Sequence, residues 1–273
     1  MVDSLKGFNI DRFADAFKNA IEWMLKDEHG NDVENEIKSL MENKRELELN
    51  PDSPKALKRL VEIMITQAWY YNKPLNFDEK MNTFINKVGT NFRTQRGRRE
   101  LFNLISVLAP PRIRNRVRNM LEELLEYPSI RRFTEELYQL AMEGKTKVLG
   151  EKGRDNYLRD FGYWDRVPID RHEMRFIVRT GIYHACSLKT RSDPLQKASL
   201  HDALTRFCSN YLKGYRVFDI DLGDAPGIVD VFIWYFCRRR GGKGYGICRR
   251  MPKCEICPLK ETCLYAIVNI STH

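Results

Sequence analysis

The chain has 273 residues, of which 42% are hydrophobic, so it can form one large domain or two modest domains around a buried core. It carries 46 lysine and arginine residues against 37 aspartate and glutamate residues, and this formal net charge of +9 favours a polyanionic partner over a charged surface that binds nothing. No run approaches the roughly 18–20 apolar residues of a membrane-spanning helix, and the N-terminal residues lack the apolar core of a signal peptide. These features exclude a membrane segment and predict a soluble intracellular protein.

Apolar residues recur every three or four positions along much of the chain, which is the pattern of amphipathic helices. Three such segments begin at a residue that can cap a helix: 11–25 at Asp11, 53–71 at Ser53 and 129–143 at Ser129. Further helices are predicted at about 101–108, 112–126, 155–161, 171–185, 199–212 and 226–238. The chain shows no convincing strand alternation and no internal repeat, so the predicted fold is all-α.

Two segments interrupt the helical pattern. Residues 144–154 are rich in glycine and lysine and form a predicted turn between two helices. Residues 239–263 are rich in glycine and cysteine. Neither segment has the composition of a flexible linker between domains, so both are expected to carry specific structure.

Four cysteines near the C-terminus follow the spacing C-x5-C-x2-C-x5-C: Cys248, Cys254, Cys257 and Cys263. Thiols stay reduced inside the cell, so this spacing predicts a metal centre in preference to disulfides. Four thiolates can hold a [4Fe–4S] cluster or a zinc ion. Zinc ribbons usually pair two C-x2-C turns, whereas this segment has one, so the cluster is the favoured interpretation.

The cysteine segment is also strongly basic. Between residues 238 and 253 there are seven basic residues and no acidic residue: Arg238, Arg239, Arg240, Lys243, Arg249, Arg250 and Lys253. Part of this charge can balance a bound metal centre. The excess predicts contacts with phosphate groups, particularly from Arg249, Arg250 and Lys253 inside the first cysteine spacer.

Taken with the cysteines, the segment Val167–His172 resembles the helix-hairpin-helix DNA glycosylases, in the endonuclease III-like branch that carries a [4Fe–4S] cluster. In that family an invariant Asp opens a helix and a His follows two residues later, which matches Asp170 and His172. The family's first cysteine spacer has six residues, and here it has five. The resemblance covers roughly residues 50–265.

The turn Leu149–Arg154 occupies the place of the family's hairpin loop, which usually reads L-P-G-V-G. Proline is absent here and the glycines are spaced differently. The resemblance implies that this loop contacts the DNA backbone, with Gly150, Gly153 and Arg154 as the predicted contact residues.

Bifunctional members of the family place a lyase lysine just after the hairpin loop. If Gly153 matches the second loop glycine, this lysine position falls on Asp155, whereas the usual interval from Asp170 falls on Lys152. The hairpin alignment carries more weight, because the loop must offer backbone N–H groups to a phosphate. It predicts a monofunctional glycosylase, with Lys152 as the alternative lyase residue that forms a Schiff base.

The resemblance assigns catalysis to Asp170. A carboxylate near the anomeric carbon would stabilise the positive charge that develops when a base leaves and could activate water. Asp170 and Glu173 also have the spacing of a helix capping box, and the two roles are compatible because a cap holds the carboxylate in place.

Several polar and aromatic residues are candidates for holding or replacing an extruded base. Gln67 matches a weak family segment whose Gln fills the space that the base leaves. Aromatic side chains could stack on the base, although packing inside the fold is their commoner role. The candidates are Gln67, Trp69, Tyr70, Tyr163, Trp164 and His172.

The resemblance therefore implies a two-lobed all-α glycosylase fold. Residues 1–55 would pack with the cluster lobe, 56–160 would form a helical lobe ending in the hairpin, and 161–273 would hold the Asp170 helix and the cluster. The expected activity is excision of a damaged or mispaired base from duplex DNA, with a slight preference for alkylated or deaminated bases. We expect a monomer that works on DNA in the cytoplasm or nucleoid.

Two other function classes stay open from the sequence. A non-catalytic protein that recognises DNA damage would keep the scaffold and bind distorted DNA. A zinc-stabilised helical protein that binds nucleic acid would keep the four cysteines without a cluster.

Overall fold

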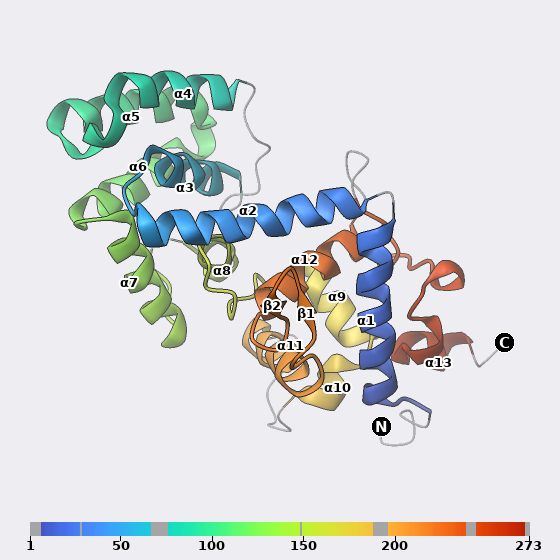
Figure 1. The fold of residues 1–273 in the computed structure, drawn as a ribbon. Helices are drawn as coiled ribbons and strands as arrows, with labels where there is room; N and C mark the ends of the chain where they lie inside the picture. The colour runs from blue at the N-terminus through green and yellow to red at the C-terminus, as the bar shows by residue number, and fades with distance from the viewer. Residues whose placement is uncertain are drawn as a thin grey trace. The chain divides into compact units, whose positions relative to one another are not determined.

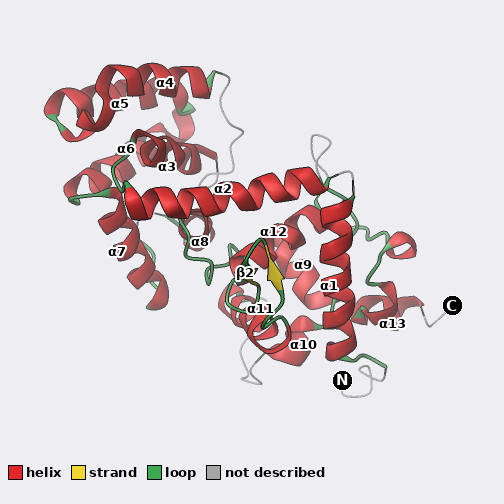
Figure 2. Cartoon of the chain, viewed as in Figure 1, coloured by secondary structure: helices red, strands yellow, loops and turns green. Residues whose placement is uncertain are grey.

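The computed structural model describes residues 7–27, 29–66, 76–147, 149–187, 196–238 and 244–270. These residues form thirteen α-helices, three 3-10 turns and one two-stranded antiparallel sheet, and Figure 2 shows helix throughout them. The all-α prediction is confirmed. The chain divides into two compact units, residues 40–163 and residues 1–39 with 164–273, whereas the sequence suggested boundaries at 56 and 160.

Helix α2 (Gly30–Leu49) contains the boundary between the units at Ser39. The unit formed by residues 40–163, here called the hairpin unit, contains six further helices and one 3-10 turn (Figure 1). They are α3 (Pro54–Thr66), α4 (Phe77–Val88), η2 (Gly89–Arg93), α5 (Gln95–Leu108), α6 (Pro111–Glu126), α7 (Ile130–Met142) and α8 (Glu151–Asp160). Their apolar faces bury a single cluster that runs from Leu47 to Phe161.

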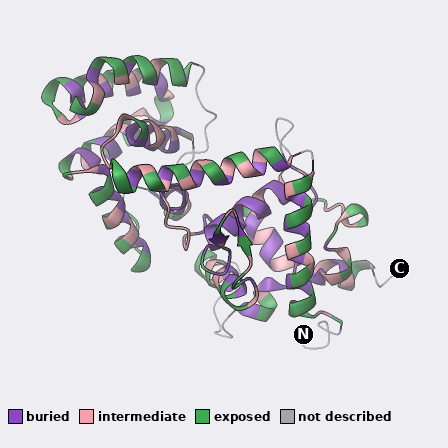
Figure 3. Ribbon diagram, in the orientation of Figure 1, coloured by how far each residue is buried: buried purple, intermediate pink, exposed green. Residues whose placement is uncertain are grey.

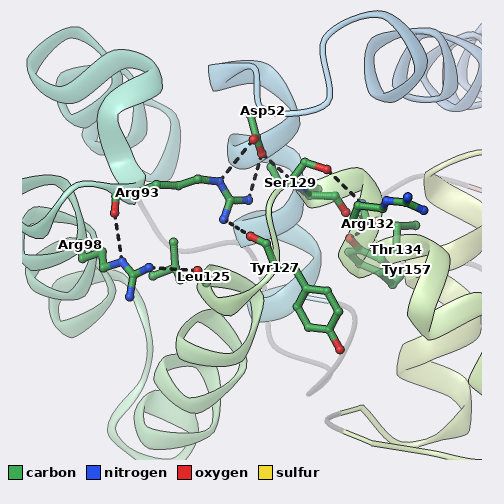
Figure 4. Close-up of polar contacts among 10 residues, drawn as sticks. Asp52, Arg93, Arg98, Leu125, Tyr127, Ser129, Arg132, Thr134 and Tyr157 are labelled. Carbon is green, nitrogen blue, oxygen red and sulfur yellow. Dashed lines mark hydrogen bonds and ion pairs between the residues drawn. The ribbon is translucent and has the colours of Figure 1, made fainter.

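Polar contacts connect three segments of the hairpin unit (Figure 4). Asp52 accepts hydrogen bonds from the Arg93 guanidinium, at 3.0 and 3.3 Å, and from the backbone N–H of Ile130 at 3.0 Å. Arg93 also donates to the carbonyl oxygen of Tyr127 at 2.6 Å. Ser129 caps α7 by accepting from the N–H of Arg132, as its sequence position predicts. The start of α7 is therefore fixed to η2 and to the turn before α3.

The second unit, here called the cysteine unit, contains the remaining elements. They are α1 (Ile10–Lys26), α9 (Arg171–Arg179), α10 (Ile182–Cys186), α11 (Lys197–Tyr211), β1 (Arg216–Val217), β2 (Ile220–Asp221), α12 (Pro226–Cys237), η3 (Cys254–Ile256), η4 (Lys260–Thr262) and α13 (Leu264–Ile270). Helix α12 is buried along nearly its whole length (Figure 3). It packs against α9, where the rings of Phe176 and Phe236 lie 5.8 Å apart. Helix α1 adds Phe17, whose ring is 5.6 Å from that of Phe176.

Several predicted elements differ from the observed ones. The single helix predicted at 171–185 is divided into α9 and α10 because Gly181 has a φ of +91°, a conformation that ends a right-handed helix. Helix α8 begins at residue 151 and not at 155, so the predicted turn is four residues shorter. Helices α2, α4 and α13 and the short β1–β2 hairpin, which pairs Arg216 with Asp221, were not predicted.

Candidate active site

Asp170 is the N-cap of α9, as the sequence predicts. Its Oδ1 accepts a hydrogen bond of 2.5 Å from the backbone N–H of His172. Glu173 completes the capping box, because its Oε2 accepts from the backbone N–H of Asp170 at 2.9 Å. The Asp170 side chain is only half-buried, so a fixed and partly accessible carboxylate lies at the positive end of a helix dipole.

Two buried carboxyl groups influence each other near the start of α9. Glu173 and Asp230, which comes from α12, are each 1% exposed. Burial raises the pKa of Glu173 well above its usual value, and the neighbouring Asp230 and Asp170 raise it further. His172 is half-buried, and burial lowers its pKa while the nearby Asp170 opposes that shift. Its buried Nδ1 has no hydrogen-bond partner among the described residues.

The predicted hairpin lies between α7 and α8. Gly144, with a φ of +69°, ends α7, and the N–H of Lys145 donates to the carbonyl oxygen of Leu140 at 2.8 Å. Gly150 is the N-cap of α8, and the N–H of Arg154 donates to its carbonyl oxygen at 2.9 Å. Gly150 is exposed at this N-cap, next to the backbone N–H groups of the first turn of α8.

The residue at which α8 begins distinguishes between Asp155 and Lys152 as the residue in the lyase position. Gly153 is buried inside the helix, so it cannot serve as the glycine at the end of the loop. Gly150 has that place, and Lys152 follows it in the first turn with a partly exposed side chain. Asp155, the position that the other alignment selects, is 6% exposed.

Arg154, predicted to contact the DNA backbone, is 4% exposed. Its Nη1 donates to the carbonyl oxygen of Lys145 at 2.5 Å, and its Nε donates to Asp155 Oδ1 at 3.1 Å. The guanidinium therefore holds the two ends of the hairpin together and does not face solvent. Its positive charge is balanced by the adjacent buried carboxylate.

The aromatic candidates Tyr163 and Trp164 belong to different units. Tyr163 stacks on Tyr138 with ring centroids 4.4 Å apart, and it lines a hollow in the hairpin unit. The wall of that hollow combines charged side chains, such as Lys44 and Arg131, with apolar ones. In the cysteine unit, the carbonyl oxygen of Trp164 accepts a 2.6 Å hydrogen bond from the first turn of α12. Gln67, Trp69 and Tyr70 lie outside the described residues.

The four predicted ligand cysteines line one cavity in the cysteine unit. Arg179, Phe176, Phe236 and Tyr265 also contribute to its wall. The cavity walls include Cys248, Cys254, Cys257 and Cys263. The sequence spacing therefore brings all four thiols to one place.

The thiols of this cavity influence one another. Burial raises the pKa values of Cys254, Cys257 and Cys263, and a negative charge on Cys248 raises all three further. Cys248 differs, because a hydrogen bond with Cys237 and the guanidinium of Arg179 lower its pKa. Four thiolates in one cavity repel one another, and bound metal cations would offset that repulsion.

Among the described residues, no group of three or more His, Cys, Asp or Glu side chains converges closely enough to hold a single metal ion. One tetrahedral zinc ion would need its four thiolates within about 2.3 Å of a common point. A [4Fe–4S] cluster is larger and accepts thiolates that are farther apart, because each cysteine binds a different iron. Four thiol donors around one cavity are the donor set that either metal group would use.

Helix α9 fastens the basic loop between the first two cysteines. Arg179, its last residue, donates to the carbonyl oxygens of Arg249 at 2.6 Å and Arg250 at 3.0 Å. The thiol of Cys263 in turn donates to the carbonyl oxygen of Arg179 at 3.4 Å. The side chains of Arg249 and Arg250 are exposed, and that of Lys253 is partly exposed, so all three can reach a partner.

Sequence reasoning missed Arg179 and Asp230. Asp230 is the one carboxylate in the apolar run of α12, and such a residue in a buried helix is a usable signal of a specific role. Arg179 carried no comparable signal, because its function depends on where the cysteine loop folds.

Comparison with known proteins gives partial similarity to base-repair enzymes. The chain is 33% identical over 108 residues to the 8-oxoguanine DNA glycosylase/AP lyase of Saccharolobus solfataricus, covering 39% of this chain and 46% of that protein. It is 33% identical over 101 residues to the protein of that name from Saccharolobus islandicus, covering 36% and 42%. The chain thus spans less than half the length of these curated relatives.

These partial matches support a relationship to the helix-hairpin-helix DNA glycosylase superfamily. No protein-family model matches the chain, and no solved structure matches it. Across the described residues, no helix is both long and apolar enough to cross a bilayer.

Proposed function

We propose that this protein is a DNA glycosylase that extrudes a damaged base from duplex DNA and excises it. The observation that carries the proposal is the half-buried carboxylate of Asp170, the N-cap of α9, which accepts a hydrogen bond from the backbone N–H of His172. The backbone N–H of Asp170 in turn donates to Glu173 Oε2. The similarity to two named glycosylases and the net charge of +9 support the same function. A base must leave the stack before its glycosidic bond can be cut, so we expect base flipping.

Asp170 would stabilise the positive charge that develops on the sugar as the bond between the base and C1′ breaks. One such charge pair at about 4 Å with an effective dielectric constant near 20 is worth about 4 kcal/mol. This corresponds to roughly three powers of ten in rate. A carboxylate fixed by the capping box needs little reorganisation to supply that energy.

We further propose that the enzyme is bifunctional, with Lys152 as the lyase nucleophile. The start of α8 at Glu151 supports this choice over the monofunctional alternative, since Gly150 has the loop position and Lys152 follows it. The neutral ε-amine would attack C1′, and the bond electrons would leave with the base, which then takes up a proton. Opening of the sugar ring gives a Schiff base, and β-elimination then releases the 3′ phosphate.

For the substrate, we propose 8-oxoguanine as the first base to test, because the similar proteins from both Saccharolobus species carry it in their names. Alkylated and deaminated bases, which the sequence alone favoured slightly, are the comparison substrates. Exposed N–H groups at the start of α8 and the side chains of Arg249, Arg250 and Lys253 are the proposed contacts with the DNA backbone. We propose that the protein works inside the cell as a monomer on duplex DNA.

We propose that Cys248, Cys254, Cys257 and Cys263 hold a [4Fe–4S] cluster. Their shared cavity and their four thiol donors support this group. Its contribution would be structural, fixing the basic loop from which Arg249 and Arg250 project. The chemistry at the sugar would be carried out by the chain's own residues.

The test is base release from a panel of duplexes that carry oxidised, alkylated, deaminated or mismatched bases. Wild type should release one of these bases and leave a strand break without alkali, and borohydride should trap a covalent complex. Asp170→Asn should lose base release by roughly three powers of ten. Lys152→Gln should lose trapping, whereas Lys145→Gln, a change at an exposed hairpin lysine, should not.

Two outcomes would change the proposal. Strand breaks that appear only after alkali, with no trapped complex, would show that the enzyme is a monofunctional glycosylase. Tight binding to damaged duplexes with no release of any base would favour a non-catalytic protein that recognises DNA damage.

A further inference from the structure

The start of α9 carries two carboxyl groups, and a third, on α12, influences the buried one of these two. Asp170 caps the helix, Glu173 lies one turn into it, and Asp230 comes from α12, which packs against α9. Glu173 and Asp230 are both 1% exposed. Glutamate side chains are almost never fully buried unless they are paired, whereas Glu173 is buried in the cysteine unit.

Glu173 and Asp170 are joined by reciprocal hydrogen bonds. The backbone N–H of Asp170 donates to Glu173 Oε2 at 2.9 Å, and the Asp170 carboxylate accepts from the first turn of α9. The capping box therefore holds the Glu173 carboxyl group within one turn of the Asp170 carboxylate. Two carboxyl groups can form a hydrogen bond with each other only if one of them carries a proton.

The surroundings favour the proton on Glu173. Among the described residues, no Lys, Arg or His forms an ion pair with it. A buried carboxylate without a cation is costly, and like charges close by increase that cost. Burial has the largest effect on the pKa of Glu173, followed by Asp230 on α12 and then Asp170 at the N-cap, and all three raise it.

We propose that Glu173 is a neutral positioning acid that donates its proton in a hydrogen bond to Asp170 and so keeps the Asp170 carboxylate ionised and oriented. This inference rests on the proposed function for its catalytic consequence. Asp230 supplies the second negative charge, which keeps the proton on Glu173. When Glu173 loses its proton at alkaline pH, Asp170 loses a hydrogen-bond donor and gains a negative neighbour, so base release declines.

The kinetic test compares Glu173→Gln with Glu173→Ala. The Gln side chain is permanently neutral, can accept from the N–H of Asp170 and can donate to its carboxylate. Glu173→Gln should therefore keep kcat close to wild type at neutral pH and lose the decline at alkaline pH. Glu173→Ala leaves Asp170 unsupported, and kcat should fall about 10²-fold, as for a small misplacement of a catalytic group.

Asp230→Asn tests the direction of the effect. Removing the Asp230 charge lowers the pKa of Glu173, so the alkaline decline in kcat should move to lower pH. A residue that only supports the fold would change stability without moving this pH dependence. An alkaline decline that is unchanged in both Glu173→Gln and Asp230→Asn would overturn the inference.

A spectroscopic test separates this inference from the proposed function. Infrared spectra of the whole protein without DNA, recorded at neutral pD, should contain the carbonyl band of a protonated carboxyl group that Glu173→Gln lacks. If the band is absent, the inference is wrong whatever the enzyme does. If the band is present but no base is released from any duplex, the neutral acid exists while its catalytic role fails together with the proposed function.

Discussion

The guanidinium of Arg179 donates a hydrogen bond of 2.6 Å to the carbonyl oxygen of Arg249, inside the spacer between the first two cysteines of the loop. Arg179 is the last residue of α9, and Asp170 caps the other end of the same helix. One short helix therefore carries the candidate catalytic carboxylate at its start and fastens the basic loop at its end.

This contact predicts that Arg179→Lys loosens the basic loop. Lysine lacks the planar fork whose two nitrogen atoms bond the Arg249 and Arg250 carbonyl oxygens, so the variant should lose at least one of these two hydrogen bonds. Loss of one hydrogen bond from a charged group, about 1.5–3 kcal/mol, should speed amide exchange in the loop by roughly tenfold or more. Arg175→Lys is the matched control, because Arg175 bonds only within α9, to the Arg171 carbonyl, among the hydrogen bonds identified for it. Equal exchange in both variants would contradict the assignment.

The proposed [4Fe–4S] cluster predicts iron and not zinc in the purified protein. An absorbance band at about 400 nm and the iron content from metal analysis should both indicate a [4Fe–4S] cluster. Cys257→Ser should lower the iron content and weaken DNA binding. Cys208→Ala removes a buried thiol of α11 that does not line the cavity, so its iron content should match wild type. Stoichiometric zinc in place of iron would favour the zinc-stabilised alternative.

We expect Arg249 and Arg250 to make the affinity for DNA depend on salt concentration. Both side chains are exposed, while their backbone is held by Arg179. Removing one side chain that binds a phosphate should reduce the slope of log affinity against log salt by about one, so Arg249→Gln with Arg250→Gln should reduce it by about two. The control is Arg112→Gln with Arg116→Gln, two exposed arginines of α6. A slope that falls equally in both double variants would show that the effect comes from net charge alone.

The sequence predicts those parts of the fold that local signals determine. Ser129 marks the start of α7 because a cap is a local interaction, and the observed helix begins at the next residue. The apolar stripe of α2, with Val33, Ile37 and Leu40, was present in the sequence and was overlooked. The break at Gly181 was missed because a glycine inside a helical pattern does not show whether its φ is positive.

The candidate site also combines features that local sequence signals predict with features that depend on distant packing. The position of Asp170 at a helix N-cap followed from a short motif, and the structure confirms that cap. The burial of Glu173 was unpredictable, because it depends on α12, which is distant in the sequence, packing over α9. The start of α8 at residue 151 was also missed, since a segment with glycines at 150 and 153 has the composition of a turn. That start is what now favours Lys152 as the lyase residue.

Gly97 gives a test of backbone packing in the hairpin unit. It lies in the first turn of α5, where its N–H donates to Thr94 Oγ1 at 3.1 Å. A Cβ atom at this position would lie 2.1 Å from the carbonyl oxygen of Asn91 and 2.6 Å from Cα of Phe92. Both neighbours are backbone atoms of η2, so they cannot move away as a side chain could. Gly97→Ala should therefore destabilise the unit by about 1–3 kcal/mol, as overpacking does in a close-packed interior.

The matched variant for this test is Gly150→Ala. Gly150 has a φ of −62°, and a Cβ atom there would meet nothing within 4 Å. Restricting the unfolded chain at such a position stabilises a protein by about 0.4–1 kcal/mol, which offsets the lower preference for Ala than for Gly at a helix N-cap. Thermal unfolding should therefore show a lower Tm for Gly97→Ala and an unchanged or higher Tm for Gly150→Ala. A Tm for Gly97→Ala equal to that of wild type would mean that α5 and η2 are not packed this closely.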